Sequence, residues 1–391
     1  MWPDLKGKFT RSRIAILGNG QLGRMLALAA HNLGMVPSVY PARSDSSAAQ
    51  VVPSAPGESL EHFAQEADVL IFENEFVDTE PLAPFAHKCF PGLSAMRVLQ
   101  DKSAQKLQLS QLQIPTAPYT VYESDQSVQV WLRSLRERFA EGCVIKWGKQ
   151  GYDGRGLHFL TGVSDAETER FVEKGLAYGP VYAEALVPFT KELALVACRS
   201  KNGEFAAYPL LTTEQREGIC HVVYGPAAEF GIDHVLDEQV SNWAKRLAVS
   251  LDLVGCFALE CFLTKSGEVL VNEIAPRVHN SGHFTQDAAA TSQFENHLRA
   301  VLGLALGSTE TAPAFLMVNV LGPATVEARG PVALPTPFPG AHLHWYGKHG
   351  IRRGRKLGHI NAAAQSADEV PRLRQAVEEM IREWEETLIH G

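Results

Sequence analysis

The first part of the chain alternates between short apolar runs and longer segments in which apolar residues recur every three or four positions. The runs predict buried strands, and the spaced segments predict amphipathic helices that cover them. The strands are expected at Arg13–Leu17, Val36–Tyr40 and Val69–Phe72, and the helices at 21–34 and 60–67. Strands that alternate with helices in this way predict a doubly wound α/β domain.

The pattern changes after a helix expected at 101–112, which ends before the Ile114-Pro115 pair. Most later strands follow one another without a regular helix between them, which is typical of an α+β region with antiparallel pairs. The strands are expected at 143–146, 157–160, 181–186, 192–199, 205–209, 257–262 and 269–274, and the helices at 127–139, 165–174 and 237–251.

The last part of the chain begins near residue 312 and has a third character. It contains an apolar strand at 315–321, a stretch rich in proline and glycine at 331–340, and a polar, amphipathic helix at 370–388. The sequence therefore predicts a small C-terminal unit after the α/β and α+β regions.

Composition narrows the class of protein. Of the 391 residues, 45% are hydrophobic and 20% are charged, which is the balance of a folded globular protein. The net charge of -8 argues against a general nucleic-acid binder, which would carry a basic face. The sequence shows no apolar run typical of a signal peptide or of a membrane span. We therefore expect a cytoplasmic protein that binds neither nucleic acid nor membrane.

The six cysteines include no CxxC pair, which argues against a zinc ribbon. Reduced thiols are expected in a protein of the cytoplasm. Cys198, Cys256 and Cys261 lie within strand patterns, so we interpret them as core residues rather than nucleophiles.

Residues 18–23 (GNGQLG) form a GxGxxG motif between a predicted strand and a predicted helix. This is the dinucleotide fingerprint, because a helix N-terminus behind a glycine turn can hold a pyrophosphate. A site for NAD usually needs an acidic residue at the end of the next strand, and that strand ends here at Tyr40-Pro41. We therefore favour a tight turn with an occasional phosphate contact, and NAD binding is the weaker alternative.

Two apolar runs on either side of a Ser-Gly turn at 266–267 predict a β-hairpin. This register places Thr264 opposite Val269 and Glu260 opposite Glu273. Two carboxylates that face each other repel, unless they share a proton or a cation.

A magnesium ion explains this carboxylate pair, with Asn272 as a neutral oxygen ligand beside it. The alternative is a pair of glutamates on a solvated face. Magnesium of this kind normally accompanies nucleotide phosphates.

A candidate phosphate cradle lies earlier in the chain. Lys146 ends a predicted strand, and residues 151–156 (GYDGRG) form a glycine-rich loop before the next one. Glycines let backbone N–H groups approach phosphate oxygens, and the lysine adds a positive charge. The loop lacks the GK[ST] of a P-loop, and its order differs from that of a protein kinase. By itself it is equally consistent with a simple hairpin turn.

The order of lysine strand, glycine loop and Glu…Asn-Glu hairpin resembles the ATP-grasp superfamily. Further segments resemble the N5-carboxyaminoimidazole ribonucleotide synthase family and together extend over nearly the whole chain. They are residues 20–25 (GQLGRM), 151–156 (GYDGRG), 272–283 (NEIAPRVHNSGH), 291–295 (TSQFE), 297–300 (HLRA), 346–348 (YGK) and 354–359 (GRKLGH).

The resemblance implies a three-domain ATP-grasp fold that combines α/β and α+β parts. The expected domains are an N-terminal α/β domain at 1–100, an ATP-grasp domain at 101–305 with a mobile lobe at about 120–190, and a C-terminal domain at 306–391. It also implies carboxylation of 5-aminoimidazole ribonucleotide with bicarbonate and ATP in purine biosynthesis, through carboxyphosphate. ATP and Mg²⁺ are the implied cofactors, and a homodimer is the implied assembly.

The resemblance also implies a nucleotide site. Its lysines are Lys102, Lys106 and Lys146, and its loop runs through Gly151, Tyr152, Asp153, Gly154, Arg155, Gly156 and Leu157. The hinge beside adenine is Glu184, Ala185, Leu186 and Val187, and the ribose carboxylate is Glu192. Glu260 and Glu273 match the magnesium ligands, and Asn272 is expected beside them. Gln215 stands where the family usually has a histidine.

For the acceptor substrate, the residues carried over are Gln21, Leu22, Glu73, Tyr152, Asp153 and Arg155 around the imidazole, and Lys348 and Arg355 at its phosphate. The region expected to hold bicarbonate is Arg277, His279 and Asn280. Asp153, Arg155, Arg277, His279 and Asn280 are the expected catalytic residues. Asp153 would orient the attacking amine or take its proton, and Arg277 would offset developing negative charge.

One departure from the family concerns residues 72–76, which read FENEF instead of the usual order Tyr-Glu-Phe-Glu-Asn. Strand alternation would still place Glu73 and Glu75 on one face. Two other functions stay open: a different ATP-grasp ligase or formyl transferase acting on a phosphorylated small molecule, and a catalytically silent nucleotide-binding homologue. The presence of Glu260, Glu273 and Arg277 argues against the silent homologue.

Overall fold

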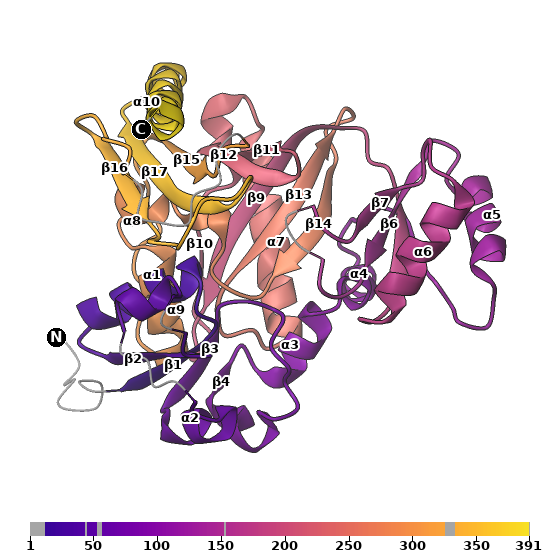
Figure 1. Cartoon of the computed structure of the whole chain (residues 1–391), viewed down its shortest axis with the longest axis horizontal. Helices are drawn as coiled ribbons and strands as arrows, with labels where there is room; N and C mark the ends of the chain where they lie inside the picture. Colours follow the sequence, from indigo (N-terminus) through magenta and orange to yellow (C-terminus); the bar gives the residue numbers. More distant parts are fainter. Residues whose placement is uncertain (1–11, 44, 53–56, 152–153, 325–332, 391) are drawn as a thin grey trace.

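The computed structural model describes residues 12–43, 45–52, 57–151, 154–324 and 333–390. Tyr152 and Asp153, which the sequence predicts in the glycine loop, lie outside the described residues, as do the first two residues of the predicted 331–340 stretch. The described residues form three sheets. Figure 1 shows that a lobe with helices α5 (Val128–Arg138) and α6 (Asp165–Leu176) stands to one side of the rest.

The N-terminal sheet is parallel, with strand order β2-β1-β3-β4. Its strands are β1 (Arg13–Leu17), β2 (Val36–Tyr40), β3 (Val69–Phe72) and β4 (Cys89–Phe90), and its helices are α1 (Gln21–Asn32), α2 (Leu60–Glu66) and α3 (Leu93–Leu99). Alternate residues of β1 face opposite sides: Ile14 and Ile16 pack with α1, while Ala15 and Leu17 pack with α2. The predicted doubly wound α/β arrangement is confirmed.

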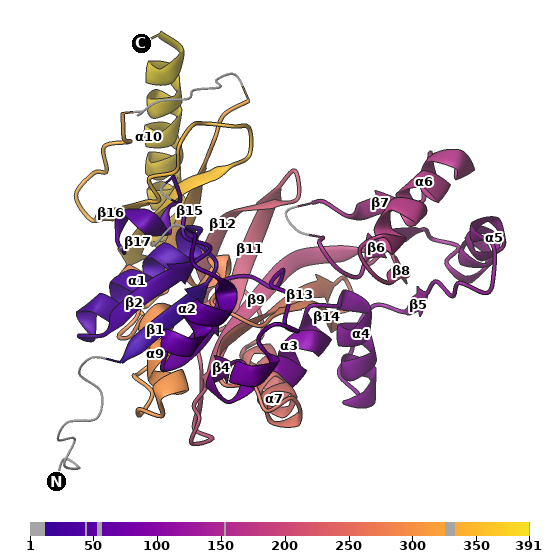
Figure 2. The same cartoon turned by 60° about the horizontal axis from the view of Figure 1, so that its bottom comes forward.

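The lobe to one side consists of a four-stranded antiparallel sheet, in the order β5-β8-β6-β7, covered by two helices (Figure 2). Its elements are β5 (Tyr119–Val121), α5 (Val128–Arg138), β6 (Cys143–Trp147), β7 (Leu157–Phe159), α6 (Asp165–Leu176) and β8 (Val181–Ala185). Trp131 and Leu135 of α5 and Val172 of α6 are buried against Ile145. Helix α4 (Lys102–Gln111) leads into this lobe.

The large sheet has nine strands, in the order β14-β13-β9-β11-β12-β15-β17-β16, with β10 paired to β9. The strands are β9 (Phe189–Arg199), β10 (Phe205–Ala207), β11 (Leu211–Arg216), β12 (Ile219–Gly225), β13 (Gly255–Thr264), β14 (Val269–Ala275), β15 (Ala314–Leu321), β16 (Ala341–Trp345) and β17 (Lys356–Ala364). Because β12 pairs with β15, strands from the ATP-grasp region and from the C-terminal part form one continuous sheet.

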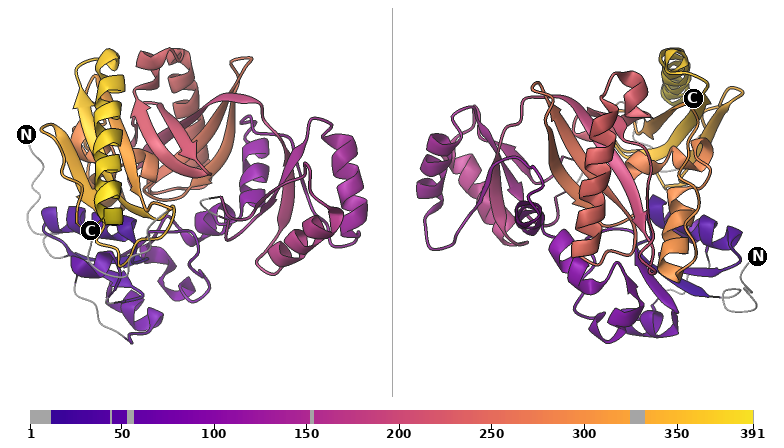
Figure 3. Two further views of the ribbon diagram at one scale, coloured as in Figure 1. Left: turned by 45° about the horizontal axis from the view of Figure 1, so that its top comes forward. Right: turned by 180° about the vertical axis from the view of Figure 1, so that it is seen from behind.

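Helices α7 (His234–Ser250), α9 (Gln293–Leu302) and α10 (Val370–His390) pack against this sheet. Helix α7 lies across its back (Figure 3). It buries Trp243 and Leu247 against β9 and β13, and α10 packs Val377 and Trp384 against the C-terminal strands. Helix α9 lies between the large sheet and α1, so it joins the first two domains. In the described parts of the chain, none of the helices has the length and apolar character that a membrane crossing requires.

Several elements are missing from the sequence prediction, among them β11, β12, β16, β17 and α9. Helix α9 does carry start and stop signals. The Ser292 side chain accepts a hydrogen bond from the N–H of Glu295, and Gly303 ends the helix at a positive φ of 70°. The four strands are harder to predict because polar and apolar residues do not alternate regularly along them. Pairing with the neighbouring strands, which the local sequence does not show, makes these segments extended.

The expectation of reduced thiols is wrong for two of the cysteines. Cys198 of β9 and Cys256 of β13 lie opposite each other on neighbouring antiparallel strands and form a disulfide. The sequence gives no sign of this, because the two residues are 58 positions apart and become neighbours only through strand pairing. Both are buried, as predicted, and so is Cys261.

Candidate active site

The predicted carboxylate pair lies on the hairpin formed by β13 and β14, where Glu260 is directly opposite Glu273. The predicted register is wrong at the turn, because Leu263 rather than Thr264 pairs with Val269. A β-bulge between Glu260 and Cys261 restores the register, so the two glutamates still face each other.

Asn272 is the residue that this bulge leaves without a cross-strand partner, since Glu260 pairs with Glu273 and Cys261 with Val271. A bulge changes the direction of a side chain. Here the Oδ1 atom of Asn272 accepts a hydrogen bond from Lys146 Nζ at 3.1 Å. The bulge therefore turns a neutral oxygen toward the same cationic region as the two carboxylates.

Each carboxylate of the pair has a positively charged or protonatable partner. Lys102 Nζ donates to Glu273 Oε2 at 2.6 Å, and His279 Nε2 lies 3.0 Å from Glu260 Oε1. Burial raises the pKa of Glu260, but the hydrogen bond and charge of His279, together with Lys102, outweigh burial and lower this pKa to about 2. Glu260 is therefore ionised at neutral pH.

The donor set suits a small, hard cation. Two carboxylate side chains and an amide oxygen are ligands of the type that Mg²⁺ takes, and this ion usually completes its shell with water and phosphate oxygens. Across the described residues, no group of three or more His, Cys, Asp and Glu side chains converges into a complete metal cage. The residues of the hairpin therefore fit a magnesium ion.

A buried cluster of charges connects the lobe to this hairpin. Lys106 Nζ lies 2.8 Å from Glu184 Oε2, and Lys146 pairs with Oε1 of the same carboxylate. Burial raises the pKa of Glu184, but Lys146 and Lys106 reverse this effect and lower it. Burial lowers the pKa of Lys106 despite the attraction of Glu184. The structure thus brings together three of the predicted nucleotide residues.

The remaining residues of the predicted hinge follow Glu184 at the end of β8. The N–H groups of Ala185 and Leu186 donate to the carbonyls of Pro118 and Gly142, so both are already used within the lobe. The carbonyl of Val187 accepts from the N–H of Phe189.

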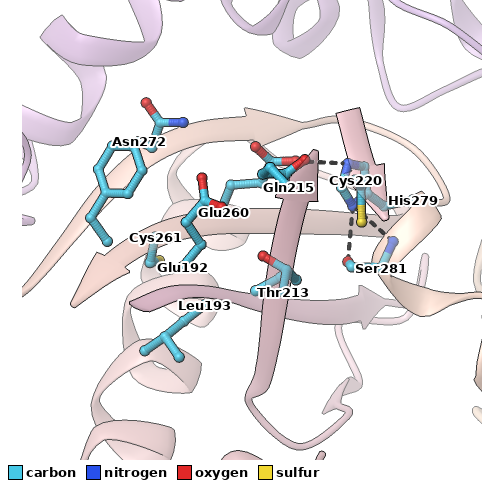
Figure 4. A pocket seen from close by; sticks show the side chains of 12 residues that line it. Glu192, Leu193, Thr213, Gln215, Cys220, Glu260, Cys261, Asn272, His279 and Ser281 are labelled. Atoms are coloured by element: carbon cyan, nitrogen blue, oxygen red, sulfur yellow. Dashed lines mark hydrogen bonds and ion pairs between the residues drawn. The ribbon is translucent and has the colours of Figure 1, made fainter. Parts of the chain in front are cut away.

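A pocket opens beside Glu260 and is shown in Figure 4. The predicted residues Glu192, Gln215, Asn272 and His279 all line it, although they come from four separate segments. Burial and the charge of Glu260 raise the pKa of Glu192 to about 7. Other residues that line the pocket, among them Thr213, Cys220 and Ser281, were not predicted from the sequence.

The glycine motif lines a second pocket, together with Gln21, Leu22, Glu73 and Arg277. The N–H of Gly20 donates to Glu73 Oε2 at 2.8 Å. A Cβ atom at Gly18 or Gly20 would collide with this carboxylate. The turn that could hold a pyrophosphate therefore holds a glutamate of the chain itself, which argues against NAD binding.

Glu73 is almost fully buried. Burial raises its pKa above the ordinary value, and the N–H groups of Gly20 and Gly23 and the charges of Arg277 and Lys348 oppose this rise. Lys348 itself lies between β16 and β17. The structure therefore places this predicted phosphate ligand within electrostatic reach of the second pocket.

Arg277 forms a two-pronged ion pair with Glu75, with Nε to Oε2 at 2.7 Å and Nη2 to Oε1 at 3.1 Å. The prediction that strand alternation places Glu73 and Glu75 on one face is wrong, because β3 ends at Phe72 and neither glutamate lies in a strand. Both side chains nevertheless approach Arg277, from the irregular segment that follows the strand. Glu75 was not among the predicted site residues, although its charge beside Glu73 was a usable signal.

The other predicted residues are distributed as follows. Arg355 Nη1 donates to the carbonyl of Gly350 at 3.0 Å, within the loop between β16 and β17. Of the glycine loop, Leu157 begins β7, and Gly154 lies against Gly218 in the β11–β12 turn. Asn280 follows His279 and exchanges hydrogen bonds with Asn319.

The fold and the carboxylate hairpin define an ATP-grasp protein, and three family models match the chain in order. They describe a ribonucleotide synthetase preATP-grasp domain at 11–100, an ATP-grasp domain at 107–294 and a phosphoribosylaminoimidazole carboxylase C-terminal domain at 316–372. The N5-carboxyaminoimidazole ribonucleotide synthase of Synechococcus elongatus is 36% identical over 93% of this chain and 92% of its own length.

Solved structures agree. Carboxyaminoimidazole ribonucleotide synthase from Aspergillus clavatus complexed with ATP has a TM-score of 0.83 and 30% identity, covering 96% of this chain and 100% of that one. The Aspergillus clavatus enzyme in complex with ADP and 5-aminoimidazole ribonucleotide has a TM-score of 0.82 and 28% identity, with the same coverage. The chain belongs to the N5-carboxyaminoimidazole ribonucleotide synthase family, and the predicted three-domain ATP-grasp fold is confirmed.

A first prediction concerns the pair of Glu75 and Arg277. Burial raises the pKa of Glu75, but Arg277 reverses this and lowers it. The ionised group therefore stabilises the fold at neutral pH, and this contribution is lost as the pH falls through the lowered pKa. Glu75→Gln should reduce the free energy of unfolding at pH 7 by about 1.5–3 kcal/mol. Chemical denaturation at several pH values should show that the difference in the free energy of unfolding between the native chain and the variant becomes smaller below the ordinary carboxyl pKa of 4.5.

The matched control is Asp252→Asn, which removes an ion pair with Arg199 whose carboxylate is 85% exposed. It should change the free energy of unfolding by about 1 kcal/mol or less. A Glu75→Gln deficit that does not vary with pH would contradict the assignment.

Proposed function

We propose that this chain is a ligase that uses ATP and bicarbonate to carboxylate the amino group of 5-aminoimidazole ribonucleotide, with ADP, phosphate and N5-carboxyaminoimidazole ribonucleotide as products. The observation that carries the proposal is the short segment from Glu273 to His279. It begins at the carboxylate hairpin, Arg277 lines the second pocket, and His279 lines the first. Two substrates bound in the two pockets would meet along this segment.

The relatives support this function. Those named above are synthases of N5-carboxyaminoimidazole ribonucleotide, and one structure holds ADP together with 5-aminoimidazole ribonucleotide. This reaction is the one that the sequence resemblance predicts, and it belongs to purine biosynthesis.

Beside the first pocket, Lys102, Lys106 and Lys146 would provide positive charge for the phosphates of ATP, and the glycine loop would close over them. Lys146 already donates to Asn272, which lines this pocket. Glu192 would accept hydrogen bonds from the ribose. Glu260, Glu273 and the Asn272 oxygen would hold Mg²⁺, which would offset phosphate charge when bound.

In the second pocket, Gln21, Leu22 and Glu73 would surround the imidazole, with Arg155 beside it. Lys348 and Arg355 would bind the phosphate of the ribonucleotide. Supporting this, the charge of Lys348 opposes the rise in the pKa of Glu73, so this lysine lies within electrostatic reach of the glycine turn that holds Glu73.

Between the pockets, Arg277, His279 and Asn280 would bind bicarbonate and the carboxyphosphate made from it. Glu75 fixes the plane of the Arg277 guanidinium, which keeps further N–H donors for an anion. Carboxyphosphate hydrolyses readily, so reacting groups that are held close and shielded from water would raise the yield of carboxylated product. Asp153 remains the predicted residue that orients the amine or takes its proton.

Other features remain predictions: a homodimer, a cytoplasmic location, and domain boundaries at 1–100, 101–305 and 306–391 with a mobile lobe at about 120–190. A different ATP-grasp ligase would share the carboxylate hairpin but use another acceptor.

The acceptor can be identified by one assay. ADP release should be measured with ATP, magnesium and bicarbonate, with and without 5-aminoimidazole ribonucleotide. We expect strong stimulation by this nucleotide, because it traps the reactive intermediate as product. Stimulation only by an amino acid or formate would contradict the proposal.

Removing one charge of the carboxylate pair tests the metal assignment. Glu273→Gln should lower kcat/KM for ATP by about 100-fold or more, since a bound metal contributes several kcal/mol of charge stabilisation. Circular dichroism should show an intact fold. Glu268→Gln, which changes an exposed glutamate on the same hairpin, should leave turnover unchanged. Normal turnover of Glu273→Gln would remove both carboxylates from the proposed metal site.

Lys348 can be tested through the affinity for the ribonucleotide. Lys348→Ala should raise KM for 5-aminoimidazole ribonucleotide by about 10- to 100-fold, the value of a lost charge-assisted hydrogen bond. KM for ATP should stay within about twofold of the native value, because Lys348 is proposed to act on the ribonucleotide alone. Lys245→Ala, at an exposed position of α7, is the matched control. An unchanged KM for the ribonucleotide would place its phosphate elsewhere.

A further inference from the structure

The backbone of His279 is held by the side chain of Gln293, the first residue of α9. The N–H of His279 donates to Gln293 Oε1 at 2.9 Å, and Gln293 Nε2 donates to the carbonyl of His279 at 2.7 Å. One amide side chain thus satisfies both backbone groups of one residue, as a neighbouring strand would do. The N–H of His279 needs an acceptor and its carbonyl needs a donor. The oxygen and the nitrogen of the Gln293 amide therefore cannot be exchanged, and the orientation of this amide is determined.

Gln293 is itself fixed on all sides. It is fully buried, its backbone N–H donates to Thr285 Oγ1 at 2.9 Å, and its Nε2 lies 3.3 Å from Nδ1 of His283. A Cβ atom at Gly282 would lie 2.6 Å from the Gln293 side chain, so the glycine leaves the room that this amide needs. The amide is therefore a rigid support for the segment that contains His279.

The ring of His279 is oriented by the same segment. Its Nδ1 accepts from the N–H of Ser281 at 3.3 Å and lies 2.9 Å from the Ser281 hydroxyl. The other ring nitrogen then carries the proton toward Glu260 Oε1, at 3.0 Å. Any shift of the His279 backbone would therefore move a group that contacts the carboxylate pair (Figure 4).

Asn280 has a support of its own from the C-terminal part of the chain. Asn280 Nδ2 donates to Asn319 Oδ1 at 3.0 Å, and Asn319 Nδ2 donates back to Asn280 Oδ1 at 2.7 Å. Asn319 belongs to β15 and also donates to the carbonyl of Cys220 on β12. An amide has two N–H donors, so this exchange fixes the plane of Asn280 and leaves its second N–H for another acceptor.

A buried amide can also be purely structural, and α9 provides such a case. Asn296 is fully buried and binds the hydroxyl of Tyr208 and the N–H of Gly307, away from the residues of either pocket. Gln293 and Asn319 differ from it in what they hold. Their partners are two consecutive residues, His279 and Asn280, of the segment that joins the two pockets.

We propose that Gln293 and Asn319 are positioning residues for bicarbonate, each acting through one of these two neighbours. Bicarbonate is a small anion with few contacts, so its reactivity depends on how narrowly its binding groups are fixed. The two supports come from different parts of the fold, one from α9 and one from β15. This role gives a physical reason for the TSQFE segment, which the assignment of the two pockets does not use. The inference rests on the proposed function.

The test compares two apolar variants of similar shape, Gln293→Met and Asn319→Leu, with the native chain. Bicarbonate should be varied at saturating ATP and 5-aminoimidazole ribonucleotide, and both ADP and carboxylated product should be measured. We expect kcat/KM for bicarbonate to fall about tenfold or more, as for the loss of buried hydrogen bonds that hold a binding group. KM for ATP should stay within about threefold, and more ADP should be released per product formed.

The matched control is Asn296→Leu, which removes an equally buried amide from the same helix. It should lower the melting temperature as much as Gln293→Met does, yet leave the bicarbonate dependence and the ratio of ADP to product unchanged. If an apolar variant does not fold, Gln293→Glu, Asn319→Asp and the control Asn296→Asp keep the size and replace the N–H donors by an acceptor oxygen, with the same added acidic group in all three. They should show the same difference in bicarbonate dependence.

Two failures can be told apart. If native protein shows no ADP release that responds to 5-aminoimidazole ribonucleotide, the proposed function fails, and this inference fails with it. If the native protein responds, but the variants at 293 and 319 change kcat/KM for bicarbonate no more than the variant at 296, the positioning role alone is overturned. An equal loss for all three substrates also overturns it, because that result describes general damage to the fold.

Discussion

The structure depends on how the chain accommodates two glutamate side chains that face each other on one hairpin. Because Glu260 and Glu273 lie directly opposite each other, their negative charges would repel strongly without positive charge nearby. Lys102 and His279 provide that offset, and they come from α4 and from the segment after β14. The lobe contributes Lys146 through Asn272. Elements from both sides of the hairpin must therefore approach it, and they converge beside the first pocket.

A second electrostatic arrangement sits at the other end of the same segment. The glycine turn receives Glu73, and Arg277 is held by Glu75, so one carboxylate is buried against backbone dipoles and the other against a guanidinium. Because Arg277 lies only four positions after Glu273, the two arrangements cannot move independently. Chemistry that must pass an unstable intermediate from one pocket to the other benefits from such a short, rigid connection.

The large sheet extends this connection to the end of the chain. Pairing of β12 with β15 makes the ATP-grasp and C-terminal strands one sheet, and Asn319 reaches from β15 to Asn280. Helix α9 binds the same segment through Gln293, and Glu75 of the N-terminal part holds Arg277. The residues between the pockets are therefore supported by all three parts of the fold. The C-terminal strands thus contact the segment that joins the two pockets.

The sequence by itself determined the local elements and the chemistry of the site residues, because apolar periodicity and residue type are local properties. The N-terminal strands, the hairpin and the opposition of Glu260 and Glu273 follow from it. Tertiary structure alone decided which distant groups meet. Glu73 enters the glycine turn from 53 positions away, Cys198 reaches Cys256, and a bulge turns Asn272 toward Lys146. Such contacts depend on strand pairing and burial across the whole chain, which no local pattern records.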